Sequence, residues 1–213
     1  MTLDGGHHNE IALTYWEDRS IRIIDAATGN EKFELKTIAT IGSINDISWS
    51  FDGSYLAAAI RDPEPMIAIW RFNEQGFDEV ATLHDTGKWE KLSWGNNYKL
   101  YSAGAFGQQQ DERKVFVWDS VSKKRQLLFD RESVITTLFA SPAGEFLATF
   151  TGLDEAKLQV RNSETMQVEL DFPKPNNLRL ARCVVWNANA TMLWGAACEP
   201  VVGTCTLWQV GYR

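Results

Sequence analysis

Cysteines and long apolar runs are scarce in this sequence, and each scarcity excludes a class of protein. Cysteine occurs three times, at Cys183, Cys198 and Cys205, without CxxC spacing. This odd, clustered set is typical of buried small side chains in a reducing compartment rather than of a disulfide framework or zinc motif. No apolar run approaches the roughly 20 residues of a membrane helix. The first residues, MTLDGGHHNEIAL, lack the basic and apolar regions of a secretory signal. We therefore expect an intracellular, cytoplasmic protein without membrane insertion, with the nucleus as the alternative.

Catalytic and cofactor-binding motifs are missing as well. The chain has no GxxxxGK[ST], GxSxG or HExxH sequence. His7 and His8 are adjacent, so their side chains would point in opposite directions on an extended segment and would not share a metal. Asp52, Asp111 and Asp154 fall in predicted turns, where carboxylates cap their own backbone. We predict no catalytic residue, cofactor or metal, and hence a protein that is not an enzyme.

Basic charge is in deficit, because 28 acidic residues outnumber 21 Lys and Arg and leave a formal net charge of −7. An acidic surface disfavours nucleic acid as a partner. The one basic cluster is Lys123-Lys124-Arg125, in a predicted hairpin. We interpret it as a solvated turn, with an anionic partner as the alternative.

A repeat of 43–48 residues is the dominant positive feature. Four alternating segments end at the anchors Trp49, Trp94, Phe139 and Trp186, which are 45, 45 and 47 residues apart. A second anchor follows each, at Trp70, Trp118, Arg161 and Trp208, and Ile24 holds this place in an earlier copy. The repeat units run over residues 1–36, 37–84, 85–129, 130–172 and 173–213, and form a single domain.

Each unit is predicted to consist of short strands separated by turns. Apolar residues alternate with polar or small ones, as at Ile67 and Ile69, and turn sequences such as Phe51-Asp52-Gly53-Ser54 interrupt them. A four-stranded sheet cannot bury both faces alone, but repeated sheets packed around an axis can. We predict an all-β fold: a β-propeller of four-stranded antiparallel blades.

The runs LTYWEDRSIRIIDAATG, WSFDGSYLAAAIRDPEPMIAIWRF and KVFVWDSVSKKR resemble blades of the WD-repeat family. The last contains the literal Trp118-Asp119 pair, and the resemblance covers essentially the whole chain. It implies about four and a half to five WD-like repeats. It gives little information about function, because proteins with this fold have many different functions. In the family a buried hydrogen-bonded set often braces a blade. The resemblance assigns that brace here to His84, Ser102, Asp111 and Trp118.

The resemblance also implies where partners bind: the face formed by the loops between second and third strands and between blades. Exposed aromatic residues beside arginines are typical of interaction hot spots. On this face we predict a partner-binding set of Trp16, Arg19, Arg61, Asp62, Lys88, Trp89, Phe106, Gln108, Arg131, Asp154 and Lys174. Trp16 and Trp89 could instead pack between blades.

The repeats are expected to be incomplete at both ends. The first unit should lack its first strand and the last its fourth, which leaves about eighteen strands. A seven-bladed ring needs about 28, and open sheet edges are avoided by soluble proteins. Three explanations stay open: a partner chain completes the ring, the sequence is part of a longer chain, or the ring is small and closes with residues 1–8.

The function that fits best is a non-catalytic protein–protein interaction scaffold, or recognition module, within a larger intracellular assembly. One alternative is a sensor propeller attached to an enzyme such as a signalling ATPase or a peptidase. Another is a propeller of a translation or RNA-associated factor. Salt-dependent RNA binding through Lys123, Lys124 and Arg125 would mark that last role.

Overall fold

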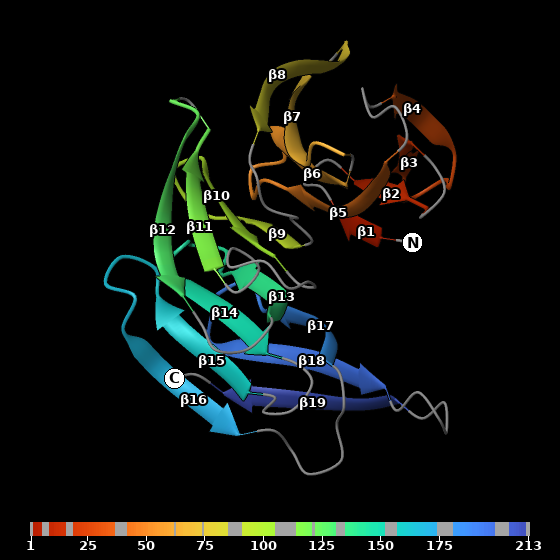
Figure 1. The fold of residues 1–213 in the computed structure, drawn as a ribbon. Helices are drawn as coiled ribbons and strands as arrows, with labels where there is room; N and C mark the ends of the chain where they lie inside the picture. The colour runs from red at the N-terminus through yellow and green to blue at the C-terminus, as the bar shows by residue number, and fades with distance from the viewer. Residues whose placement is uncertain are drawn as a thin grey trace.

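In the residues that it describes, the computed structural model shows an all-β protein with nineteen strands in five sheets (Figure 1). The structure describes residues 2–5, 9–15, 19–36, 42–61, 63–73, 75–84, 91–104, 114–120, 122–130, 135–151, 157–173, 181–198 and 205–211. Within these residues no helix is long and apolar enough to cross a membrane.

Each sheet is an antiparallel meander of strands consecutive in sequence. Sheet 1 contains β1 (Thr2–Gly5), β2 (Glu10–Thr14), β3 (Ser20–Asp25) and β4 (Glu31–Lys36), and sheet 2 contains β5 (Ser43–Trp49), β6 (Tyr55–Arg61), β7 (Met66–Asn73) and β8 (Gly76–His84). Sheet 3 contains β9 (Lys91–Trp94), β10 (Lys99–Ala103), β11 (Lys114–Asp119) and β12 (Lys124–Asp130), and sheet 4 contains β13 (Ile135–Ala140), β14 (Phe146–Thr151), β15 (Lys157–Asn162) and β16 (Val168–Pro173). Sheet 5 contains β17 (Ala181–Trp186), β18 (Met192–Cys198) and β19 (Cys205–Gly211).

The five sheets follow one another in an arc, with their first strands gathered on the inside and their last strands at the periphery (Figure 1). Neighbouring first strands are in contact along the whole series β1, β5, β9, β13 and β17. This radial arrangement is that of a β-propeller, and it confirms the predicted fold class.

The first sheet corrects one expectation, because it does not lack its first strand. Residues Thr2–Gly5 form β1, which pairs antiparallel with β2 and sets Thr2 opposite Thr14. The Asp4 carboxylate also accepts a 2.6 Å hydrogen bond from the Trp49 backbone N–H. The four residues of β1 are too few to show a strand alternation, so contacts with β2 and β5 define this strand rather than its own sequence. Within the described part of the chain the strands number nineteen, against the expected total of about eighteen.

The structure also moves one repeat anchor by a residue. The Ser50 hydroxyl accepts the N–H of Tyr55 at 2.9 Å, and the Ser141 hydroxyl accepts the N–H of Phe146 at 3.0 Å. These matching turns make Ala140, and not Phe139, the counterpart of Trp49. The four residues Trp49, Trp94, Ala140 and Trp186 are called the anchor positions below, and they lie 45, 46 and 46 residues apart.

Hydrogen bonds between first strands lock neighbouring sheets together. The Ser48 hydroxyl accepts the N–H of Trp94 at 3.4 Å, and the Ser93 hydroxyl accepts the N–H of Ala140 at 2.9 Å. The indole N–H of Trp94 donates to the Ser48 carbonyl at 2.9 Å, and that of Trp186 donates to the Phe139 carbonyl at 3.3 Å. Because buried polar groups need partners, these bonds fix the register of one sheet against the next.

The core consists of apolar layers between consecutive sheets, each built from one face of a sheet and the facing side of its successor. The residue after the one paired with each anchor, called the second-strand position, points to the next sheet: Ala57, Tyr101 and Ala148 in sheets 2 to 4. In sheet 1, Ala12 lies in the core layer shared with sheet 2 and takes the corresponding place. These side chains are at most 2% exposed. Each sheet thus depends on its neighbour for burial.

Candidate interaction surfaces

Two of the eleven residues predicted for partner binding lie in the described part of the chain. Arg19 is exposed just before β3, and Arg61 is exposed at the end of β6. Both flank the connection between the second and third strands of their sheets, as predicted. The other nine lie outside the described residues: Trp16, Asp62, Lys88, Trp89, Phe106, Gln108, Arg131, Asp154 and Lys174. That face stays a prediction.

The proposed brace of sheet 3 is visible only in part. The Trp118 indole N–H donates a 2.8 Å hydrogen bond to the Ser102 hydroxyl, and both side chains are buried. His84 is exposed at the end of β8, and Asp111 lies outside the described residues. The structure brings Ser102 and Trp118 together, while the four-residue brace stays a prediction.

The basic cluster belongs to the hairpin between β11 and β12. Lys123 lies in the turn with a φ of 57°, and the Arg125 guanidinium carbon lies 4.5 Å from the centre of the Phe116 ring. Burial lowers the pKa of Arg125. This arginine packs on its own sheet, so it is not a free anion ligand.

Of the three turn carboxylates Asp52, Asp111 and Asp154, Asp52 lies in the described residues and takes part in the fold. Although partial burial raises its pKa, hydrogen bonds from Ser50 and Ser54 hold the pKa of Asp52 below its usual value. The Ser50 hydroxyl donates to Asp52 at 2.6 Å, so this carboxylate caps its turn as expected. Among the described residues no three His, Cys, Asp or Glu side chains gather to hold a metal.

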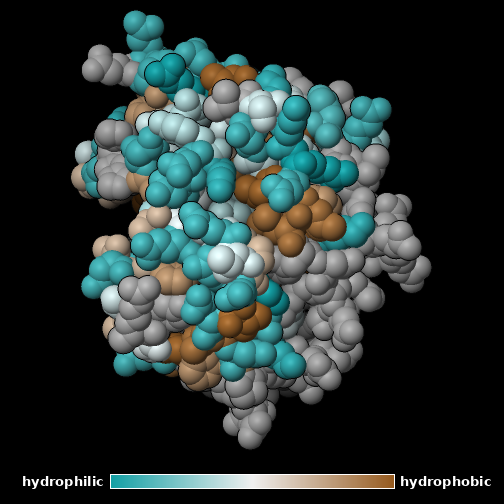
Figure 2. Space-filling view, turned by 90° about the vertical axis from the view of Figure 1, so that its left-hand side faces the viewer, coloured by the Kyte–Doolittle hydropathy of each residue, from teal (hydrophilic) through white to brown (hydrophobic). Residues whose placement is uncertain are grey.

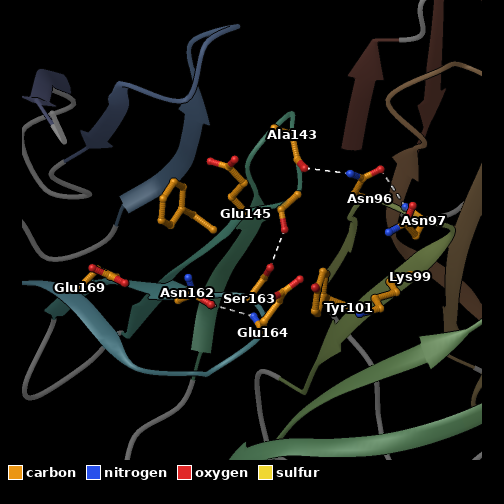
Figure 3. Close-up of a pocket in the computed structure, with 12 residues that line it drawn as sticks. Asn96, Asn97, Lys99, Tyr101, Ala143, Glu145, Asn162, Ser163, Glu164 and Glu169 are labelled. Atoms are coloured by element: carbon orange, nitrogen blue, oxygen red, sulfur yellow. Dashed lines mark hydrogen bonds between the residues drawn. The ribbon is translucent and has the colours of Figure 1, made fainter.

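A pocket of about 510 Å³ opens between sheets 3 and 4 (Figure 3). Its wall from sheet 3 is the β9–β10 turn, and its wall from sheet 4 comprises the β13–β14 and β15–β16 turns. It is lined by Asn96, Asn97, Lys99, Tyr101, Ala143, Gly144, Glu145, Phe146, Asn162, Ser163, Glu164 and Glu169. In antiparallel meanders these turns lie at the opposite end from the second-to-third-strand loops, so the pocket is on the face opposite the predicted one.

Close contact between two turns shapes the pocket. The Asn96 amide donates to the Ala143 carbonyl at 3.0 Å, across the boundary between the sheets. Gly144 has a φ of 72°, and a Cβ there would collide with Asn96. Asn162 holds the third turn, because its side-chain oxygen accepts the N–H groups of Glu164 and Thr165, each at 3.0 Å. The asparagines therefore position the walls.

The floor of the pocket is a buried, neutral phenol. Tyr101 is 2% exposed, and its hydroxyl is hydrogen-bonded with Ser163. Burial raises the pKa of Tyr101, with a smaller opposing effect from Ser163, so the phenol stays protonated at neutral pH. The Ser163 hydroxyl in turn donates to the Gly144 carbonyl at 2.5 Å. These hydrogen bonds link the floor, which comes from sheet 3, to both turns of the sheet-4 wall.

The rim of the pocket is acidic. Glu145, Glu164 and Glu169 are exposed there, against one exposed cation, Lys99. Within the described residues none of these three carboxylates has an ion pair or side-chain hydrogen bond. Figure 3 shows Glu145 and Glu169 on one side of the pocket and Glu164 beside Ser163. The pocket therefore presents unpaired acceptors around a rigid polar floor.

A second unusual surface is the outer face of sheet 5. Val185, Trp194 and Leu207 are 51%, 45% and 80% exposed. Val185 pairs with Trp194 across β17 and β18, and Leu207 pairs with Ala196, two residues beyond Trp194. These three residues are called the sheet-5 face below. The side bearing the outer strands β12 and β16 is mostly hydrophilic, with hydrophobic residues in separate patches (Figure 2).

Sequence reasoning missed both surfaces. The pocket is formed by three turns from two repeat units, and no single sequence motif predicts that these turns lie together. The exposure of Leu207 also has no signal in the sequence, because Ile67, Val115 and Leu158 at the same repeat position are equally apolar and are all buried.

Comparisons with known proteins agree on the architecture. No protein-family model matches the chain. A coronin-like protein of Saccharomyces cerevisiae is 28% identical over 104 residues, which cover 48% of this chain and 15% of that protein. A chain in the crystal structure of the mitotic checkpoint complex superposes with a TM-score of 0.71 at 18% identity, over 99% of this chain and 63% of the other. This chain thus spans less than two thirds of either protein, and the structural likeness carries the fold alone.

Proposed function

We propose that this chain, whose fold is that of a WD-repeat β-propeller, is a non-catalytic protein-interaction module in a larger intracellular, cytoplasmic assembly. The observation that carries the proposal is the pocket between sheets 3 and 4. Rigid scaffolds that display turns are suited to recognition, and the three carboxylates at the rim of this pocket have no ion pair or side-chain hydrogen bond with another described residue.

The charge of the pocket favours a basic side chain of a partner protein as its ligand. Three carboxylates face one ammonium group at the rim, so a cation gains more attraction than repulsion there. A guanidinium or ammonium group would donate hydrogen bonds to carboxylates that have no ion pair with another described residue, and such charge-assisted bonds are the stronger kind. The neutral Tyr101 floor adds no competing charge.

Nuclear magnetic resonance titration tests this role with defined probes. We expect N-acetyl-arginine amide to shift the amide signals of Asn97, Gly144 and Ser163 saturably, with a dissociation constant of about 1–10 mM, as suits a few charge-assisted bonds. The uncharged isostere N-acetyl-citrulline amide should cause no saturable shift. N-acetyl-lysine amide distinguishes a planar guanidinium from a point charge.

A carboxylate variant supplies the matched control. Glu164→Gln should weaken binding of the arginine probe about three- to tenfold, whereas Glu34→Gln, an exposed change on β4, should leave it unaltered. Equal binding of arginine and citrulline probes, or equal effects of the two variants, would overturn the proposal.

A further inference from the structure

We propose that the boundary between sheets 1 and 2 carries a separate binding site, which takes a trimethylammonium group. The site is a pocket of about 370 Å³ between β4 and the β7–β8 hairpin. Three aromatic residues line it, Phe33, Trp70 and Phe77, together with Leu35 and Glu79. It is called the aromatic pocket below. It shares no lining residue with the pocket between sheets 3 and 4, so the inference does not depend on the role of that pocket.

Strand register directs the lining side chains toward the same space. On β8, Phe77 and Glu79 are two residues apart and therefore project from the same face of sheet 2. Glu79 pairs with Trp70, which belongs to the core layer that sheet 2 shares with sheet 1. From sheet 1, Phe33 packs against this same layer. The rings and the carboxylate thus meet between the two sheets.

Two phenylalanine rings form a corner of the aromatic pocket. The ring centroids of Phe33 and Phe77 are 5.8 Å apart, and the ring planes meet at 77°. Both side chains are only partly buried. Gly76 lies beside the corner, where a Cβ would come to 3.6 Å from Cε1 of Phe33, so the missing side chain leaves this ring uncovered. Because a ring face attracts a cation within about 6 Å of its centroid, this corner favours a cation that contacts both rings.

A carboxylate adds a full negative charge to the two rings. Oε1 of Glu79 accepts a 2.6 Å hydrogen bond from the Thr82 hydroxyl, which holds the carboxylate in place on β8. Glu79 has no ion pair with another described residue. Glu34 and Lys36 also line the pocket, but both are exposed and their opposite charges offset each other. The charge of Glu79 therefore favours a cation over a neutral ligand.

The kind of cation follows from what the aromatic pocket offers, which is ring faces and one carboxylate. A primary ammonium group has three N–H donors and needs acceptors in place of the water that it leaves. A trimethylammonium group has no N–H, so ring faces suffice as its partners. The pocket between sheets 3 and 4, with three carboxylates at its rim, suits an N–H donor instead. Trimethylammonium occurs on free cations such as choline and on trimethylated lysine, and the test separates these sources.

Nuclear magnetic resonance titration of the whole chain tests the inference. Choline should shift the amide signals of Phe33, Gly76 and Glu79 saturably, with a dissociation constant of about 1–10 mM. Neohexyl alcohol, its uncharged carbon isostere, and N-acetyl-lysine amide should bind about tenfold more weakly or less. Equal binding of choline and either control would overturn the proposal. Tighter binding of N-acetyl-trimethyl-lysine amide than of choline would assign the site to a modified protein, and the reverse would assign it to a free cation.

Matched variants test the residues. Phe77→Leu keeps apolar contact but removes one ring, and Glu79→Gln removes the charge, so each should weaken choline binding about three- to tenfold. Glu64→Gln, an exposed change at the opposite end of sheet 2, should leave binding unaltered. Unchanged choline binding in Glu79→Gln, or an equal loss in Glu64→Gln, would overturn the proposal even where Phe77→Leu fails to fold. The amide signals of Asn97 and Ser163 report the other pocket separately.

Discussion

Single residues decide how closely two sheets approach, and Gly144 is the clearest case. Gly144 and Gly29 both have a φ of 72°, which favours glycine, but only Gly144 stands against a neighbour, Asn96. Gly29→Ala should therefore lower the free energy of unfolding by about 1 kcal/mol through backbone strain alone. Gly144→Ala should cost about 2 kcal/mol more, because the added methyl group separates the turns. Urea unfolding measures both, and equal losses would show that the approach to Asn96 is not tight.

A buried carboxylate adds a pH dependence at the boundary of sheets 2 and 3. Burial raises the pKa of Asp46 above its usual 3.8, although Lys91 lies 3.7 Å away and the Leu92 N–H donates at 2.8 Å. An acid with a raised folded-state pKa holds its proton more tightly when folded. Its contribution to stability is therefore greatest below the unfolded pKa and falls as pH rises through the folded pKa.

Asp46→Asn isolates this effect, because the amide does not titrate. We expect the unfolding free energy of the variant, minus that of the original protein, to increase from about pH 4 to about pH 7. Urea unfolding at several pH values gives this difference, in which other titrating groups cancel. A difference that stays constant or decreases would mean that Lys91 and the Leu92 N–H lower the pKa of Asp46 at least as much as burial raises it.

Among the elements, β1 shows best how the sheets are tied together. Asp4→Ala removes the acceptor of the Trp49 N–H, so that amide should exchange with solvent about tenfold faster or more, in line with the loss of a hydrogen bond to a charged group. The Trp94 N–H, held by Ser48 between sheets 2 and 3, is the internal control and should keep its exchange rate. Equal acceleration at both amides would indicate general unfolding instead.

The elements also show how far the sequence could be read. Spaced tryptophans and turn residues predicted five sheets of meandering strands, because each repeat carries the same local pattern. The sequence did not predict β1, because Thr2–Gly5 is too short to show a strand pattern and is recognised as a strand only by its pairing with β2. The aromatic side chain of Phe139 predicts an anchor, but the turn at Ser141 shows that Ala140 occupies the anchor position. The pocket could not be predicted, since Lys99, Glu145 and Glu164 meet only when two repeats pack side by side.

At the scale of the whole molecule, two surfaces point outward from one rigid arc. The pocket is acidic and polar, and the sheet-5 face is apolar, so they suit different contacts: a basic side chain in one case and an apolar surface in the other. Four inter-sheet interfaces support both surfaces, because each sheet buries its faces only against its neighbours. An assembly that covers the sheet-5 face would thus also stabilise the arc that carries the pocket.

The native mass of the particle tests the central claim, an interaction module within an assembly, most directly. Native mass spectrometry of the protein isolated from its own cells should give a particle that holds a second, different polypeptide besides the one that contains this chain. A stable particle that holds only the polypeptide containing this chain, and that unfolds cooperatively, would contradict the account.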